Sequence, residues 1–392
     1  MALLGLLLVA RVAAQDSSTD STSPDSRFRR AGPVLRWNVV ARELITRELE
    51  SSGDHAGRVT FYAGNNNSRL YALVSGAQYD ALRAEGRSPA ADAASAGAAA
   101  AVLRTVFPAA HAILAGELAE ERARLSRSGV SVPASAAAEQ RGRRAAARWV
   151  RFAAAELEAG DWSGSVPVGP GRWPADGEPP ALANSVTLRP WFLASPGQFR
   201  PPPPPAFDTP AFRAALAEVR QVTRARTREQ TKATWRWARN AATLWSEIGG
   251  DLILRHRLAE PEAARMLMYL NMTLSDATIA CWDAKLAYWL LRPSQADSTI
   301  DPSVPLPHFP SYPSAHATLF AAAAAVLGHV VPTEAALLDS TAEEATMSRL
   351  WAGVHYRFDN EAGTRLGRSV GELAIAAMDR EAGSPPPGRA VR

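Results

Sequence analysis

Lysine and cysteine are the residues that this chain of 392 residues has least of. Among its 43 basic residues only Lys232 and Lys285 are lysine, and all the others are arginine. A coding bias toward arginine explains such a ratio, but it leaves open why a compact ammonium is used at these two positions. Cys281 is the single cysteine, so an intramolecular disulfide is excluded.

Strand signals and long apolar runs are also scarce. Alternating β-branched residues occur only around residues 58–62. Helical spacing of apolar residues is widespread instead, which predicts an all-α fold with little or no sheet. No apolar run reaches the roughly 20 residues that span a membrane, and the alanine-rich stretch 317–331 is better explained as a buried helix. Because the formal charge of +4 is spread among acidic residues, we expect no nucleic acid partner.

Apolar spacing, together with start and stop residues, places the helices along the chain. They are expected over residues 34–49, from the Asn-rich loop 65–68 to 82, 93–125 with a break at Pro108, 136–159, 209–222, 227–248, 251–258 and 261–291, with two more beginning at Ala315 and Glu361.

Between residues 164 and 205 proline and glycine dominate, and Pro201–Pro205 must be extended. A stretch of this length without helix is either an interdomain linker or an ordered strap across the helices. Its aromatic residues, among them Trp173, Trp191 and Phe199, give it apolar surface for packing, so we favour the strap.

The first 14 residues are short, apolar and end in small residues, which resembles a secretory signal peptide and predicts a secreted or periplasmic protein. The expected organisation is therefore a signal peptide at 1–14, a flexible leader at 15–31, an N-terminal helical half at 32–163, the Pro-rich strap at 164–207, a C-terminal catalytic helical bundle at 208–382 and a flexible tail at 383–392.

Lys285 and Arg292 lie seven residues apart on one predicted helix, so we expect them to project from the same face, two turns from each other. The simpler alternative is a solvated basic face. The residues between them are nearly all apolar, however, so this helix is expected to be buried. Buried charges need a partner.

Ser314, Ala315 and His316 follow Pro313, where a Pro-rich loop meets a predicted helix. A helix start carries unpaired N–H groups and the positive end of the helix dipole, so it suits an anion. Ser314 adds a hydroxyl and His316 a titratable ring. A plain serine N-cap is the alternative for this segment.

Arg349 precedes His355, and Asp359 follows four residues after the histidine. This spacing lets the carboxylate bind one ring nitrogen and leave the other free as a ligand or nucleophile. An ordinary surface His–Asp pair is the alternative. Taken together, the three blocks predict a pocket for a tetrahedral oxyanion.

The pattern Lys-x6-Arg-Pro, then Pro-Ser-x-His, then Ser-Arg-x5-His-x3-Asp resembles that of the vanadium-dependent haloperoxidases and the type 2 phosphatidic acid phosphatase superfamily. The segment 348–359 is especially similar to the soluble haloperoxidase branch, as are residues 309–312 and Trp282. The Pro-rich strap and residues 227–231 look like secreted bacterial members. The resemblance is strong over roughly residues 180–365 and weak before that.

The resemblance implies a helical bundle and a role for each matching residue. Vanadate, or phosphate in the same site, would be held by Lys285, Arg292, Arg349, Ser314 and the N–H of Ala315. His355 would be the axial ligand of vanadium or the nucleophile of a phosphatase, with Asp359 orienting it. His316 would be the general acid–base, and Lys285 would also polarise peroxide. One departure is Ala315, where the family usually has glycine.

Three functions follow from this resemblance. The first is a vanadate-dependent haloperoxidase that oxidises halide with hydrogen peroxide to hypohalous acid. The second is an acid phosphatase acting on phosphate esters through a phosphohistidine. The third is an inactive oxyanion-binding protein, favoured only by Ala315. Halide preference, the organic substrate and the oligomeric state do not follow from the sequence.

Overall fold

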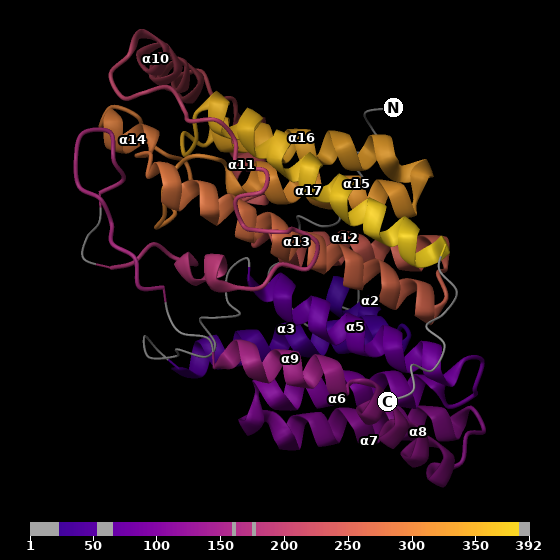
Figure 1. The fold of residues 1–392 in the computed structure, drawn as a ribbon. Helices are drawn as coiled ribbons and strands as arrows, with labels where there is room; N and C mark the ends of the chain where they lie inside the picture. Colours follow the sequence, from indigo (N-terminus) through magenta and orange to yellow (C-terminus); the bar gives the residue numbers. More distant parts are fainter. Residues whose placement is uncertain (1–22, 53–65, 159–161, 175–177, 384–392) are drawn as a thin grey trace. The chain divides into compact units, whose positions relative to one another are not determined.

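The computed structural model describes residues 23–52, 66–158, 162–174 and 178–383 (Figure 1). Within these ranges the chain is helical without any strand, and an isolated bridge joins Arg172 to Leu290. The predicted all-α fold is confirmed. The predicted signal peptide, the possible strand at 58–62 and nearly all of the predicted tail lie outside the described residues. None of the helices in the described ranges is both long and apolar enough to cross a membrane.

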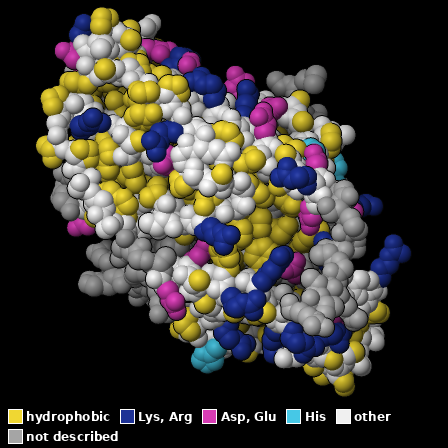
Figure 2. Space-filling view, in the orientation of Figure 1, with side chains coloured by type: hydrophobic (Ala, Val, Ile, Leu, Met, Phe, Trp, Pro, Cys, Tyr) yellow, Lys and Arg dark blue, Asp and Glu magenta, His cyan; other side chains and the backbone are white. Residues whose placement is uncertain are grey.

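The chain divides into two compact units, each made of two separate stretches of sequence. Unit 1 comprises Met1–Gly160 and Ala242–Met272, and unit 2 comprises Asp161–Ala241 and Thr273–Arg392. The expected division into consecutive segments, from the signal peptide at 1–14 to the tail at 383–392, stays a prediction. On the face drawn in Figure 2, acidic side chains lie among the basic ones.

Unit 1 is a helical bundle. Its helices are α2 (Pro24–Arg29), α3 (Pro33–Ser52), α5 (Asn67–Glu85), α6 (Ala91–Val106), η3 (Pro108–Ala110), α7 (His111–Arg127), α8 (Val132–Ala145), α9 (Ala147–Leu157), nearly all of α12 (Ala241–His256) and the first part of α13 (Glu260–Tyr288). The break at Pro108 is where the sequence places it, whereas the break at Ala146 was not predicted. Residues 24–29, part of the predicted flexible leader, instead form α2, because Phe28 is buried and Arg27 pairs with Asp251 at 2.9 Å.

Glu260, in the first turn of α13, caps the start of α3. Its Oε2 accepts a hydrogen bond from the N–H of Val34 at 3.0 Å, one of the N–H groups that a helix start leaves unpaired. Burial raises the pKa of this carboxyl to about 7, and the nearby Asp92 and Glu121 act in the same direction. The folded structure therefore disfavours the ionised form of Glu260 at neutral pH.

We expect Glu260→Gln to stabilise unit 1 at pH 8 and to have little effect at pH 4. The folded pKa lies above the ordinary value of 4.5, so the folded state holds more protons between pH 4.5 and 7. Stability therefore falls as the pH rises through this window. Glutamine keeps the acceptor for Val34 but cannot ionise, so the melting temperature at pH 8 should rise by several degrees.

Circular dichroism melts at both pH values measure this change. The matched control is Glu262→Gln, an exposed carboxyl on the same turn. An equal shift for Glu260→Gln at pH 4 and pH 8 would show that ionisation of Glu260 is not the cause.

Unit 2 contains the segments singled out for chemistry. Its helices are η4 (Ala183–Thr187), α10 (Pro210–Arg224), α11 (Arg228–Arg236), the remainder of α13, α14 (Pro293–Ala296), α15 (Ala315–Val330), η5 (Pro332–Glu334), α16 (Ala335–Trp351) and α17 (Arg357–Gly383). Helix α15 packs against both α16 and α17 (Figure 1). The sequence predicted α15 and α17 but not α16, and it placed a break near 250 where α12 is continuous.

Glycines on α17 allow the close approach of α15. Gly363, Gly367 and Gly371 repeat every four residues and so lie on one face of the helix. A Cβ atom at Gly367 would lie 2.1 Å from the carbonyl oxygen of Thr318 on α15, and one at Gly363 would lie 2.6 Å from that of Ser314. The backbones of the two helices are thus nearly in contact.

The Pro-rich segment is anchored to the helices of unit 2. The carboxylate of Asp276 on α13 accepts hydrogen bonds from three successive N–H groups, those of residues 191–193, at 2.7–3.0 Å. The hydroxyls of Tyr288 and Tyr312 donate to the carbonyls of Pro201 and Pro202, both at 2.7 Å. These contacts favour an ordered strap over an interdomain linker.

Candidate active site

Helix α13 ends at Tyr288, before Arg292 is reached. The expectation that Lys285 and Arg292 share one helical face is therefore wrong. The N–H of Trp289 closes the helix on the carbonyl of Lys285 at 2.8 Å, and Trp289 takes a left-handed φ of 53°. The chain then leaves the helix to pair with the strap, where the N–H of Trp173 donates to the Trp289 carbonyl.

Lys285 is fully buried, and its ammonium group donates to three backbone carbonyls of one loop. Nζ lies 2.7 Å from the oxygen of Pro310, 2.9 Å from that of Ser311 and 2.6 Å from that of Pro313. The ring of Phe309 lies 5.0 Å from Nζ and adds a cation–π contact. All three protons of the ammonium are used by these carbonyls.

Arg292 precedes α14 and is also fully buried. Its Nε donates to the carbonyl of Phe309 at 3.1 Å, and its Nη1 to that of Val354 at 2.8 Å. Nη1 also lies 3.0 Å from Nε2 of His355. Nη2 is buried and has no hydrogen-bond partner. One edge of this guanidinium is therefore left for a ligand.

The loop that holds Lys285 leads directly into α15. Ser314 is the N-cap, with its Oγ accepting the N–H of Ala317 at 3.4 Å, so the cap considered as the alternative for this segment is present. Ala315 is buried at the first position of the helix. His316 follows, hydrogen-bonded to the backbone of Trp237, and its buried Nε2 has no partner.

Arg349 comes from the last turn of α16, the helix that was not predicted. It is 2% exposed, yet its Nε and Nη1 are buried without hydrogen-bond partners. A guanidinium in this state has donors that only a bound group can satisfy.

His355 and Asp359 form the predicted pair, at 2.9 Å between Nδ1 and Oδ2. The same oxygen accepts from the hydroxyl of Ser311 at 2.5 Å and from the N–H of Tyr356 at 3.1 Å. Ser311 was quoted in the resemblance but given no role. A hydroxyl side chain in the loop is the only sequence signal for this hydrogen bond to Asp359. The two residues lie 48 positions apart, so no local pattern joins them.

The electrostatics of the site favour an anion. Burial lowers the pKa of Lys285 to about 7, of Arg292 to about 9 and of Arg349 to about 10. Burial also lowers the pKa values of His316 and His355 well below 6.5, and the nearby arginines lower them further. Both rings are therefore neutral at pH 7, which leaves each a lone pair.

Asp359 is the carboxylate that faces these cations. Burial raises its pKa to about 6, although the hydroxyl of Ser311 and the charge of Lys285 oppose this shift. One carboxylate cannot neutralise two buried guanidinium groups together with Lys285, whose pKa of about 7 leaves it partly charged at neutral pH. The free donors of Arg292 and Arg349 therefore fit a small oxyanion such as vanadate or phosphate.

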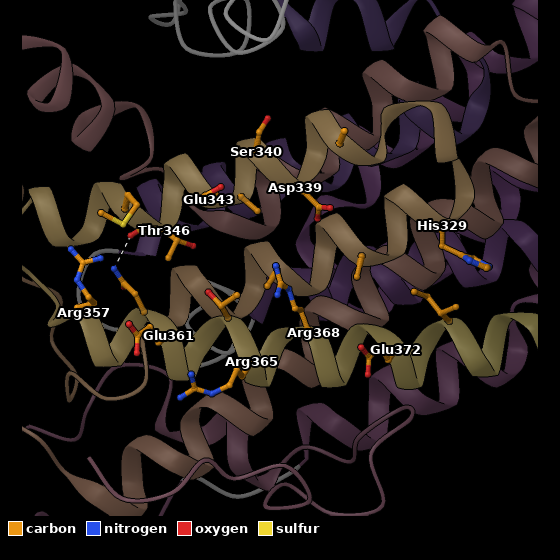
Figure 3. Close-up of a pocket in the computed structure, with 18 residues that line it drawn as sticks. His329, Asp339, Ser340, Glu343, Thr346, Arg357, Glu361, Arg365, Arg368 and Glu372 are labelled. Carbon is orange, nitrogen blue, oxygen red and sulfur yellow. Dashed lines mark hydrogen bonds between the residues drawn. The ribbon is translucent and has the colours of Figure 1, made fainter. Parts of the chain in front are cut away.

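A cavity with a volume of about 940 Å³ lies elsewhere in unit 2. Side chains of α15, α16 and α17 line it, including Asp339 and Glu343 on α16 and Arg365 and Arg368 on α17 (Figure 3). None of the predicted site residues belongs to this groove, so its size does not make it the candidate active site.

Comparison with known structures supports the fold that the three sequence blocks suggested. A family model described as the VCPO second helical-bundle domain matches residues 329–383, which include α16 and α17. A bacterial vanadium-dependent iodoperoxidase matches with a TM-score of 0.68 and 21% identity, over 87% of this chain and 95% of its own. This chain has the fold of the vanadium haloperoxidases.

A bacterial vanadium-dependent chloroperoxidase gives the same result. Its holo form matches with a TM-score of 0.66 and 13% identity over 95% of this chain and 98% of its own. Its apo form matches with a TM-score of 0.65 and 14% identity over 81% and 93%. No curated protein sequence matches the chain. The resemblance read from the three sequence blocks is therefore confirmed, and at these identities it establishes the fold.

Proposed function

We propose that this protein is a vanadate-dependent haloperoxidase-like enzyme, which oxidises halide with hydrogen peroxide to hypohalous acid. The observation that carries the proposal is a set of buried polar atoms without partners on the haloperoxidase fold. These are Nη2 of Arg292, Nε and Nη1 of Arg349, and Nε2 of His316. Buried arginine donors without partners cost free energy, so an oxyanion that accepts from them would stabilise the site, while Nε2 of His316 would accept from a protonated oxygen of the same ligand.

His355 would bind the central atom. Its Nδ1 faces the carboxylate of Asp359 at 2.9 Å, which fixes the proton there and leaves the Nε2 lone pair as the ligand. Arg292 Nη1 lies against that lone pair at 3.0 Å, so this guanidinium would turn toward the oxyanion when the ligand bond forms. Arg292 and Arg349 would then neutralise the oxygens.

Vanadate in this site would supply the Lewis acid that activates hydrogen peroxide toward halide. Oxidation of halide by peroxide to hypohalous acid and water consumes one proton. His316 would move that proton through its unpartnered Nε2, because a bound oxyanion would offset the charge of Arg349, which together with burial lowers the pKa of this ring. The peroxide, the halide and vanadate are thus the expected partners.

An acid phosphatase is the second candidate, because phosphate has the same shape and charge as vanadate. His355 would attack the phosphorus atom through the same lone pair and form a phosphohistidine. His316, protonated once the bound phosphate offsets the charge of the nearby arginines, would protonate the departing ester oxygen, and water would then release phosphate. Nothing in the donor set separates the two chemistries.

Paired assays test the proposal. Purified apoprotein is expected to brominate a phenol-red dye with peroxide only after vanadate is added. Hydrolysis of p-nitrophenyl phosphate, inhibited by vanadate, would support the phosphatase instead. Halide preference is read from the same assay with iodide, bromide and chloride.

The control for this assay is His355→Ala, measured by binding as well as by activity. We expect vanadate affinity to fall by at least about tenfold, because the bond to the central atom is lost. If neither activity is found and His355→Ala binds vanadate as tightly as the parent protein, the site assignment is wrong.

A further inference from the structure

Unit 1 has a surface hollow with a basic rim, which we call the arginine hollow. It lies between α6, α8 and α9 and has a volume of about 380 Å³. Three arginines and three apolar residues line it: Arg104, Arg143, Arg151, Ala101, Ala147 and Val150. Helix α6 packs against both α8 and α9, which the break at Ala146 separates. The hollow therefore brings together guanidinium groups from three different helices.

Positive charge exceeds negative charge on these helices. They carry six arginines and three acidic residues, and basic side chains gather around α8 on the face drawn in Figure 2. Each acidic residue already faces arginines: Glu139 with Arg122 and Arg143, Glu156 with Arg69, and Asp92 with Arg36 and Arg124. Only Glu139 therefore reaches an arginine of the hollow, and it shares its single charge with a second arginine.

The other two arginines of the hollow have no carboxylate. Arg104 and Arg151 are exposed, and neither forms an ion pair or a side-chain hydrogen bond within the described residues. Arg104 and Arg143 lie in the last turns of α6 and α8, where a cation also offsets the helix dipole. Arg151 lies in the middle of α9, so the helix dipole does not explain its position.

We propose that the arginine hollow is a second anion site, separate from the candidate active site in unit 2, for a phosphate or phosphonate group on a small apolar body. Guanidinium groups bind such an anion through paired N–H donors, and those of Arg104 and Arg151 are available. Ala101, Ala147 and Val150 are only partly buried, so an apolar body can lie on them. A volume of about 380 Å³ suits a ring-sized ligand.

Phenylphosphonate is the probe for this site, because it carries the anionic group and an apolar ring but has no ester bond to hydrolyse. Calorimetric titration of the whole chain at low ionic strength should detect binding in the hollow. In the double variant Arg104→Met/Arg151→Met the affinity of this site should fall at least about tenfold, because two charged donors are lost. Both positions are exposed and without partners, so the melting temperature should hardly change.

The matched control is Arg144→Met. Arg144 follows Arg143 on α8, is exposed and without a partner in the described residues, but does not line the hollow. Its loss should leave the affinity for phenylphosphonate within about twofold of the parent value, because a solvated charge outside the hollow is screened. Equal losses in Arg144→Met and in the double variant would show that net charge alone attracts the anion, and this would overturn the proposal.

The variant Arg104→Lys/Arg151→Lys tests the geometry of the donors. Lysine keeps the charge but removes the planar pair of N–H groups, so the affinity should fall between those of the parent and the methionine double variant. An affinity as high as that of the parent would contradict binding by paired guanidinium donors.

Two further measurements separate the hollow from other anion sites. Arg349→Met removes a guanidinium of the candidate active site in unit 2, and binding of phenylphosphonate in the hollow should survive this change. If Arg349→Met abolishes all binding of phenylphosphonate, the hollow is no anion site, whatever the activity of unit 2. Binding to vesicles of an anionic phospholipid, without any binding of phenylphosphonate, would identify a membrane surface instead and would also overturn the proposal.

Discussion

Gly367→Ala is expected to lower the free energy of unfolding by about 3 kcal/mol or more, which is a large part of the stability of an ordinary domain. The added Cβ would lie 2.1 Å from the carbonyl oxygen of Thr318. That atom belongs to the backbone of α15, so it cannot move without displacing the helix. Overpacking at such a point costs more than the small gain in helix propensity from alanine.

Two other glycines test how the loss of stability depends on the space around the added Cβ atom. A Cβ at Gly371 would meet the Cβ of Ala325 at 2.9 Å, which is less severe, so Gly371→Ala should cost less than Gly367→Ala. Gly116 lies in the interior of α7 with nothing within 4 Å of its Cβ position, and Gly116→Ala should be neutral or stabilising by up to about 1 kcal/mol. Urea unfolding of the three variants, followed by circular dichroism, gives the order. Equal values for Gly367→Ala and Gly116→Ala would show that α17 does not approach α15 this closely.

The glycine face of α17 also shows what a sequence can and cannot reveal. The spacing of residues 363, 367 and 371 is visible by inspection, and it marks one face of a helix. What lies opposite that face depends on tertiary packing. The break at Pro108 was predicted because proline acts locally on its own helix. The all-α class was predicted because apolar periodicity is also local.

Two errors in the predicted helices have different origins. The apolar run after Lys285 reads as a continuous helix, but Trp289 ends it by pairing with the strap, a contact with residues more than 100 positions earlier. Helix α16 was not predicted, although residues 335–351 contain no glycine or proline to interrupt a helix. The candidate site residues were predicted from their spacing, yet the contacts of Lys285 and Ser311 depend on a loop whose shape no local pattern encodes.

Arg349→Met is expected to change stability and ligand binding in opposite directions. The guanidinium is 2% exposed and has unpartnered Nε and Nη1 atoms, and its burial lowers its pKa to about 10. Methionine has a similar length and no charge to desolvate. The free energy of unfolding of the apoprotein should therefore rise by about 1–3 kcal/mol. Vanadate or phosphate affinity should fall about 100-fold, since two charge-assisted donors are lost.

Urea unfolding in phosphate-free buffer and calorimetric titration with vanadate measure the two effects on one sample. The control is Arg357→Met, eight residues further along, where an exposed guanidinium pairs with Glu218 at 2.6 Å. That surface pair should contribute less than about 1 kcal/mol, and its loss should leave anion affinity unchanged. A destabilised Arg349→Met that still binds vanadate normally would mean that Arg349 serves the fold. The expected result instead means that Arg349 lowers the stability of the folded apoprotein and raises its affinity for the anion. Such a trade-off between stability and function is typical of a binding site that is already formed before its ligand binds.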